Sequence, residues 1–302
     1  MANQLIEDIK LSLRNENPVT RLIMINVAVF LFISLLTILY MLTGYSMMLG
    51  TIQETIIRNI TLPLHFGRFL VKPWTLFTYM FAQQGIFHIL WNMISLYWFG
   101  KLLSYYTATK KIIPLYILGG IAGGLVTIIV FAIVPMFHGY AGNNLIGASA
   151  SVTAIIVATA TLIPDVKINL ILIGPVKLLY FAVIVIFIDV LNVATEANVG
   201  GNVSHLGGAL MGYIFIVQYK KGRDMSKWIN RFFDWIRGLF KINPKSTMKT
   251  VHKRAIPDEE YNSNRRANQQ TVDEILDKIS KSGYDSLTKA EKEILFKASD
   301  KI

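Results

Sequence analysis

Four polar residues within apolar stretches of the sequence have side chains suited to acyl-transfer chemistry: Ser149, His205, His88 and Asn92. A serine hydroxyl becomes an effective nucleophile when a histidine within hydrogen-bond reach takes its proton. His88 and Asn92 are four residues apart, so on a helix they point the same way. Both can donate hydrogen bonds to the oxyanion of a tetrahedral intermediate, together with a backbone N–H near Ser149. This set predicts hydrolysis by way of an acyl intermediate on the serine.

Each of these residues has a simpler interpretation when it is considered alone. A serine in a membrane helix usually donates to a carbonyl of its own preceding turn. A histidine such as His205 can serve packing, and His88 with Asn92 can clamp two helices together. Ser151 is a rival nucleophile, but two steps of about 100° place it about 200° around the helix from Ser149. Only the joint occurrence of the four residues favours catalysis.

Asp189 and Asn192 are a second polar pair in an apolar segment. Ionisable residues inside a membrane segment are rare and usually functional, so an ion path is one interpretation. We favour another, in which the two side chains bond neighbouring helices or line the wall of a cavity.

The composition indicates a membrane protein. Of 302 residues, 53% are hydrophobic and only 16% are charged, whereas about 25% charge is usual in soluble domains. The absence of cysteine excludes thiolate catalysis and cysteine-type zinc sites. His65, His138 and His252 show no metal-ligand spacing, so we expect no metal and no cofactor. The net charge of +11 favours attraction to an anionic lipid bilayer over nucleic-acid binding.

Six apolar segments predict an all-α, polytopic fold with six transmembrane helices. A crossing needs about 20 apolar residues, and two of the segments reach this length without a charge. The segments are Leu22–Thr43, Ile86–Leu103, Ile112–Met136, Ser149–Ile163, Leu178–Val193 and Val203–Tyr219. An even number of crossings places both termini on one side. Lys and Arg are absent from residues 137–147 and 194–202, so the positive-inside rule makes both termini cytoplasmic.

This topology brings the candidate catalytic residues to one depth. The second, fourth and sixth segments run in the same direction, and His88, Ser149 and His205 all lie near their outer ends. The fourth segment rises only about 22 Å, short of the hydrocarbon core of about 30 Å. We therefore expect it to begin below the outer surface, beside a cavity that admits water.

Small residues predict a close approach of the fourth and sixth segments. Gly147, Ala150 and Ala154 recur at three- or four-residue spacing, and Gly208 and Gly212 share a face with His205. Such small-xxx-small surfaces let two membrane helices pack closely, which a Ser–His contact requires.

Outside the apolar region the sequence predicts four further parts. Residues 1–20 form an amino-terminal cytosolic tail before the membrane domain of 21–220, and 221–241 form an interfacial amphipathic helix. Residues 242–270 are polar and predict a linker. Two capping-box patterns, Thr271-x-x-Glu274 and Thr288-x-x-Glu291, predict a cytosolic helical pair over 271–302.

The motifs resemble those of the rhomboid family of intramembrane serine proteases. The matching pieces are His88-x-x-x-Asn92, Gly147-Ala-Ser149-Ala and His205-x-x-Gly208-x-x-x-Gly212, in this order on the second, fourth and sixth segments. The resemblance covers about residues 20–220. It implies a Ser149/His205 dyad without an acidic third member, with His88, Asn92 and the Ser149 amide as the oxyanion hole. The implied substrates are single-span transmembrane proteins cut near their outer end, and the implied location is a cell membrane.

Three positions depart from the family pattern: Ala150 and Thr153 after the serine, and Ser204 before the histidine. None of them removes a group that the mechanism needs. The alternative is a non-catalytic relative on the same fold that binds or dislocates membrane clients. A transporter is a third class, against which stands the lack of an inverted repeat. The oligomeric state and the physiological substrate do not follow from the sequence.

Overall fold

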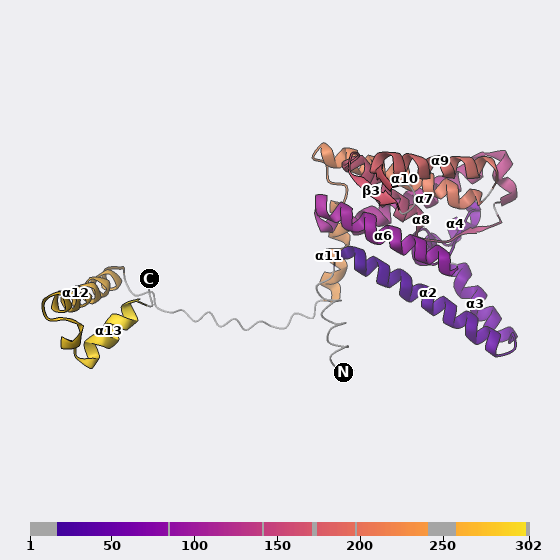
Figure 1. The fold of residues 1–302 in the computed structure, drawn as a ribbon. Helices are drawn as coiled ribbons and strands as arrows, with labels where there is room; N and C mark the ends of the chain where they lie inside the picture. The colour runs from indigo at the N-terminus through magenta and orange to yellow at the C-terminus, as the bar shows by residue number, and fades with distance from the viewer. Residues whose placement is uncertain are drawn as a thin grey trace. The chain divides into compact units, whose positions relative to one another are not determined.

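The structure, a computed structural model, describes residues 17–83, 85–140, 142–170, 174–196, 198–240 and 258–299. The chain divides into two compact units, Met1–Phe240 and Lys241–Ile302. Each is described by itself (Figure 1).

All six predicted apolar segments are helical in the first unit. The helices are α2 (Pro18–Leu42), α6 (Ile86–Tyr106), α7 (Ile112–Ile133), α8 (Ser149–Leu162), α9 (Leu178–Ala194) and α10 (Val199–Lys220). Within the described residues, two helical stretches are long and apolar enough to cross a membrane, Pro18–Leu42 and Thr109–Ile133, while α8 and α9 are apolar but shorter. The number of six crossings therefore stays a prediction.

A proline ends one helix earlier than the apolar stretch of the sequence predicts. The third apolar segment was predicted to continue to Met136, but α7 ends at Ile133. Val134 is extended, with φ −97° and ψ 109°, because the residue before a proline avoids the helical conformation. Pro135 then starts the 3-10 helix η3 (Pro135–Tyr140).

Helix α8 is the centre of the first unit. It contacts α6, α7, α9 and α10 (Figure 1), and every residue from Ala150 to Ala160 is buried. Its approach to α10 depends on glycine: a Cβ at Gly208 would overlap the carbonyl oxygen of Ala150, and one at Gly212 would overlap that of Ala154. The backbones of α8 and α10 are thus in direct contact at two successive turns.

The region Tyr45–Lys72, between the first two apolar segments, contains regular structure. Its elements are α3 (Met47–Ile60), β1 (Leu62–Pro63) and α4 (Phe66–Val71). Strand β1 pairs antiparallel with β2 (Asn144–Leu145), which fixes the chain just before α8. The short helices α5 (Thr75–Thr78), η1 (Tyr79–Phe81) and η2 (Thr109–Lys111) and the hairpin of β3 (Lys167–Leu170) and β4 (Gly174–Lys177) complete the connections.

Helix α11 (Lys227–Phe240) is held at the start of α7 by polar contacts. Lys111 Nζ lies 2.9 Å from Asp224 Oδ2, just before α11, and Asn230 Nδ2 donates to the Lys110 carbonyl at 3.5 Å. Burial disfavours the charged form of Asp224, but hydrogen bonds from Ser226 and Lys111 outweigh it and lower the pKa of this carboxyl to about 2. The apolar face of α11 is anchored by Ile229, which is buried.

The second unit contains α12 (Asp258–Ser282), η4 (Tyr284–Ser286) and α13 (Lys289–Ser299). Helix α12 begins 13 residues before position 271 and so covers part of the range assigned above to a linker. Polarity does not oppose helix formation there, because Glu, Arg, Ala and Gln are good helix formers. Residues 242–257 of that range lie outside the described residues.

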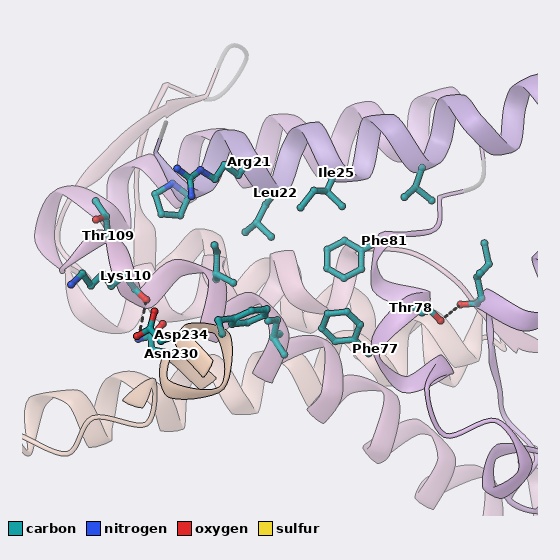
Figure 2. Close-up of a pocket in the computed structure, with 16 residues that line it drawn as sticks. Arg21, Leu22, Ile25, Phe77, Thr78, Phe81, Thr109, Lys110, Asn230 and Asp234 are labelled. Atoms are coloured by element: carbon teal, nitrogen blue, oxygen red, sulfur yellow. Dashed lines mark hydrogen bonds between the residues drawn. The ribbon is translucent and has the colours of Figure 1, made fainter. Parts of the chain in front are cut away.

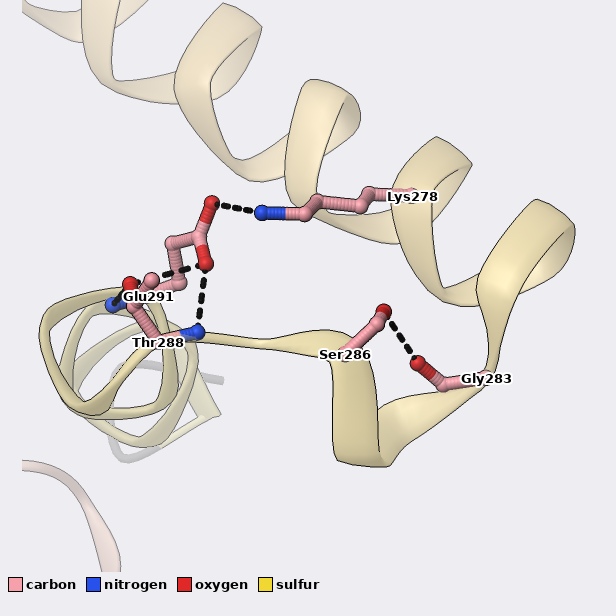
Figure 3. A network of polar contacts seen from close by, with 5 residues as sticks. All are labelled: Lys278, Gly283, Ser286, Thr288 and Glu291. Atoms are coloured by element: carbon pink, nitrogen blue, oxygen red, sulfur yellow. Dashed lines mark hydrogen bonds and ion pairs between the residues drawn. The ribbon is translucent and has the colours of Figure 1, made fainter.

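A capping box joins the two helices of the second unit (Figure 3). Glu291 Oε2 accepts from Thr288 N at 2.7 Å and from Thr288 Oγ1 at 2.8 Å, and Oε1 accepts from Lys278 Nζ at 2.8 Å. The hydrogen bond from Lys278, followed by those from Thr288, lowers the pKa of Glu291 to about 2.

Candidate active site

The four residues singled out for acyl-transfer chemistry line one cavity of about 710 Å³. Ser149, His205, His88 and Asn92 reach it from α8, α10 and α6. The remaining lining comes mainly from the β2 region and the connection between α9 and α10: Leu64, Trp91, Phe131, Asn143, Asn144, Leu145, Ile146, Glu196, Asn198, Val199, Gly200 and Gly201. Among the described residues that line the cavity, Glu196 has the only carboxylate and no lysine or arginine is present.

Ser149 is the first residue of α8, where a helix has unpaired backbone N–H groups. Gly147 precedes it with φ +129°, a conformation that suits glycine, and its N–H donates to the Tyr79 carbonyl at 3.1 Å. A Cβ at Gly147 would lie 2.8 Å from His88 Cε1 and 3.7 Å from Ser149 Oγ. Gly147 therefore lets His88 approach the serine, at a helix end whose dipole favours negative charge.

His205 is fixed from the side of α9. Its Nδ1 lies 2.8 Å from Oδ1 of Asp189, and the side chains of His205 and Asp189 are 20% and 8% exposed. The rhomboid resemblance implies a dyad without an acidic third member, but here a carboxylate meets the histidine. The sequence predicted that Asp189 bonds a neighbouring helix, and this contact is such a bond. It did not identify His205 as the partner.

Asn92 belongs to a buried chain of neutral polar groups. Its Nδ2 donates to Gln83 Oε1 at 3.1 Å, and Gln83 Nε2 donates to Asn26 Oδ1 at 3.0 Å. Asn26 Nδ2 donates to Tyr116 Oη at 3.0 Å, and Tyr116 Oη donates to the Met80 carbonyl at 2.7 Å. Because an amide nitrogen has two hydrogens, Asn92 can hold its orientation through Gln83 and still offer a donor to the cavity.

Sequence reasoning did not identify Gln83 or Asn26. Gln83 lies in a connection between elements, and Asn26 is one polar residue in an apolar helix. The available signal was Asn26, because a buried amide in a membrane helix calls for a hydrogen-bond partner.

Ser151 faces away from the cavity, as its helical spacing predicts. It is fully buried, with Oγ directed at Met80 Sδ at 3.9 Å, and a Cβ at Gly120 of α7 would lie 2.7 Å from this oxygen. Ser204 does not compete for His205, because its Oγ donates to the Gly201 carbonyl at 2.7 Å. Ala150 and Thr153 are buried in the helix bundle.

A second cavity, of about 730 Å³, lies elsewhere in the unit and contains none of the four residues. Figure 2 shows its apolar wall, to which Leu22, Ile25, Phe77 and Phe81 contribute, with Lys110 and Asn230 at one end. Its described lining contains no serine and no histidine. The cavity around Ser149 is therefore the candidate active site.

A bundle of apolar helices around a cavity with polar and apolar lining is typical of a helical membrane protein. Comparison with known families then gives a match to the Rhomboid domain over residues 71–221, which is half of the chain. The chain belongs to the rhomboid family. Residues 257–301 match a family of unknown function (DUF6576).

A curated relative supports the same assignment. The chain is 30% identical over 159 residues to RHOMBOID-like protein 12, mitochondrial, of Arabidopsis thaliana. The similarity covers 49% of this chain and 47% of the relative, so the chain spans about half the length of the curated relative that it matches.

Proposed function

We propose that this chain is an intramembrane serine endopeptidase that cuts single-span transmembrane proteins near the outer face of a cell membrane. The observation that carries the proposal is the shared cavity. It is lined by Ser149 at the start of a helix, by His205, whose Nδ1 contacts Asp189, and by the two donors His88 and Asn92. Membership of the rhomboid family adds support.

The residues suggest a two-stage reaction. His205 takes the proton of Ser149 as its Oγ attacks the substrate carbonyl, and then gives that proton to the leaving amine. His88, Asn92 and the Ser149 N–H donate to the oxyanion, where one such donor is worth about 3–4 kcal/mol of the barrier. Water then hydrolyses the acyl-enzyme, with His205 again as the base.

The topology is part of the same proposal. Six helices cross the bilayer and both termini are cytoplasmic, which agrees with the absence of Lys and Arg from residues 137–147 and 194–202. The Ser149 end of α8 then faces the outer side. No cofactor or metal is required by this mechanism.

The test uses purified full-length protein in proteoliposomes with a single-span reporter that has small residues near its outer end. We expect cleavage by the wild type and by Ser151→Ala, and no cleavage by Ser149→Ala or His205→Ala. If the wild type binds the reporter without cutting it, the chain is a non-catalytic client-binding protein, and the proposal is overturned.

A further inference from the structure

Asp189 is the single charged residue of α9, the helix Leu178–Ala194. Its side chain is 8% exposed in a helix whose other residues are mainly apolar. A buried carboxylate loses its hydration, and a hydrogen bond or a charge partner must compensate for this loss. Its hydrogen-bond partner is Nδ1 of His205 on α10, 2.8 Å from Oδ1.

We propose that Asp189 is a positioning residue for His205, so that Ser149, His205 and Asp189 form a triad. This inference rests on the proposed function. An ionised carboxylate accepts hydrogen bonds but donates none. Its contact therefore requires a hydrogen on Nδ1 and leaves Nε2 of the neutral ring as the acceptor. That is the tautomer that a base for Ser149 must have.

The second oxygen of Asp189 supports a role in charge stabilisation. Oδ2 is buried and has no hydrogen-bond partner among the described residues. A carboxylate with one uncompensated oxygen keeps much of its negative potential. When His205 takes the proton of Ser149, the imidazolium that forms gains a charged neighbour at 2.8 Å, so the interaction strengthens as the reaction proceeds.

A purely structural tie between α9 and α10 is the competing explanation, and an amide distinguishes the two. Asp189→Asn keeps the size of the side chain and can still hydrogen-bond to the imidazole. It removes the negative charge and can donate to Nδ1, which would move the ring hydrogen to Nε2. A structural tie survives this change, whereas a positioning role does not.

The experiment compares kcat and KM of the full-length wild type, Asp189→Asn and the control Asn192→Leu in the proteoliposome assay. Asn192 is the other polar residue near the end of α9. We expect Asp189→Asn to lower kcat about 100-fold or more with little change in KM, the pattern of a lost transition-state interaction. The control should stay within about threefold of wild type.

A second readout follows the tautomer directly. In protein with ¹⁵N-labelled histidine, the wild-type His205 signals, assigned with His205→Gln, should be those of the Nδ1–H form. The Nε2–H form in the wild type would overturn the inference even if Asp189→Asn failed to fold.

The outcomes separate the two levels of the proposal. If the wild type cleaves and Asp189→Asn keeps its kcat, the positioning role is wrong and the serine protease stands. If the wild type does not cleave, the proposed function fails and the positioning role of Asp189 fails with it.

Discussion

Hydrogen-bonded carboxylates occur in both units of the chain, in opposite environments. Glu291 of the second unit is 26% exposed, yet three hydrogen bonds occupy both of its oxygens. Asp189 of the first unit is 8% exposed, yet one of its oxygens has no partner among the described residues. Folding alone favours the reverse, since an unsatisfied polar group costs most where water is excluded. Glu291 caps a helix, and the unpartnered oxygen of Asp189 supports the positioning role proposed for it.

In the buried first unit, we expect the largest effect from a substitution at the contact between α8 and α10. In Gly208→Val, a side chain would overlap the Ala150 carbonyl and push the two helices apart. We expect loss of cleavage and a fall in the thermal midpoint of more than about 10 °C, because overpacking a core costs several kcal/mol when the backbone must move. Circular dichroism and the cleavage assay measure both effects.

Gly139→Ala is the matched control, because a Cβ at Gly139 meets nothing within 4 Å. It should behave as the wild type does. A stable and active Gly208→Val variant would show that α8 and α10 are not in direct contact.

A smaller effect is expected from the neutral network behind Asn92. Gln83→Leu removes the acceptor for Asn92 and the donor for Asn26. Leaving buried polar groups unpaired costs about 1–3 kcal/mol each, and a less well oriented Asn92 should lower kcat about tenfold. Thermal unfolding and steady-state kinetics test the two effects.

Gln53→Leu controls for the loss of a glutamine amide. Gln53 Nε2 donates to Thr37 Oγ1 at 2.7 Å, and Gln53 is not among the cavity residues. It should cost some stability with kcat unchanged. If Gln83→Leu had the same profile, the network would hold the fold only, without orienting Asn92.

We expect the smallest effect on stability at Glu291 of the second unit, and this effect should depend on pH. The pKa of Glu291 is lowered from 4.5 to about 2 in the folded chain. Its contribution to stability is therefore complete above about pH 4.5 and is lost as the pH falls through about 2. Glu291→Gln should increase amide exchange in α13 at pH 7, and the difference from wild type should shrink as the pH approaches 2.

Hydrogen–deuterium exchange of peptides from residues 271–299, in the full-length protein, measures this effect. Glu293→Gln is the control, an exposed carboxyl on the same helix. The effect of Glu291→Gln should weaken at high salt because exposed charges are screened. A difference from wild type that persisted unchanged at pH 2 would contradict the assignment.

Local sequence was enough to predict the helical segments, and much less informative about their contacts. Composition identified all six apolar helices, because continuous apolar stretches of this kind have few alternatives. It did not identify α3, in a region of mixed polarity, or the early start of α12. The end of α7 depended on a local detail, Pro135 directly after Val134.

In the candidate site, too, the residues could be predicted but their contacts could not. Ser149, His205, His88 and Asn92 could be selected from residue type and spacing, because these determine depth and helix face. The contact of Asp189 with His205 could not, since it depends on how α9 is rotated against α10. The link from Asn92 through Gln83 to Asn26 joins segments far apart in the chain, and no periodicity reports such a link.

The most direct test of the central claim is covalent labelling of the folded, full-length protein by a fluorophosphonate probe, with mass spectrometry of the modified peptide. The account predicts one adduct, on Ser149, which is kept in Ser151→Ala and lost in Ser149→Ala and His205→Ala. An adduct on Ser151, or no adduct on a folded wild type, would contradict it.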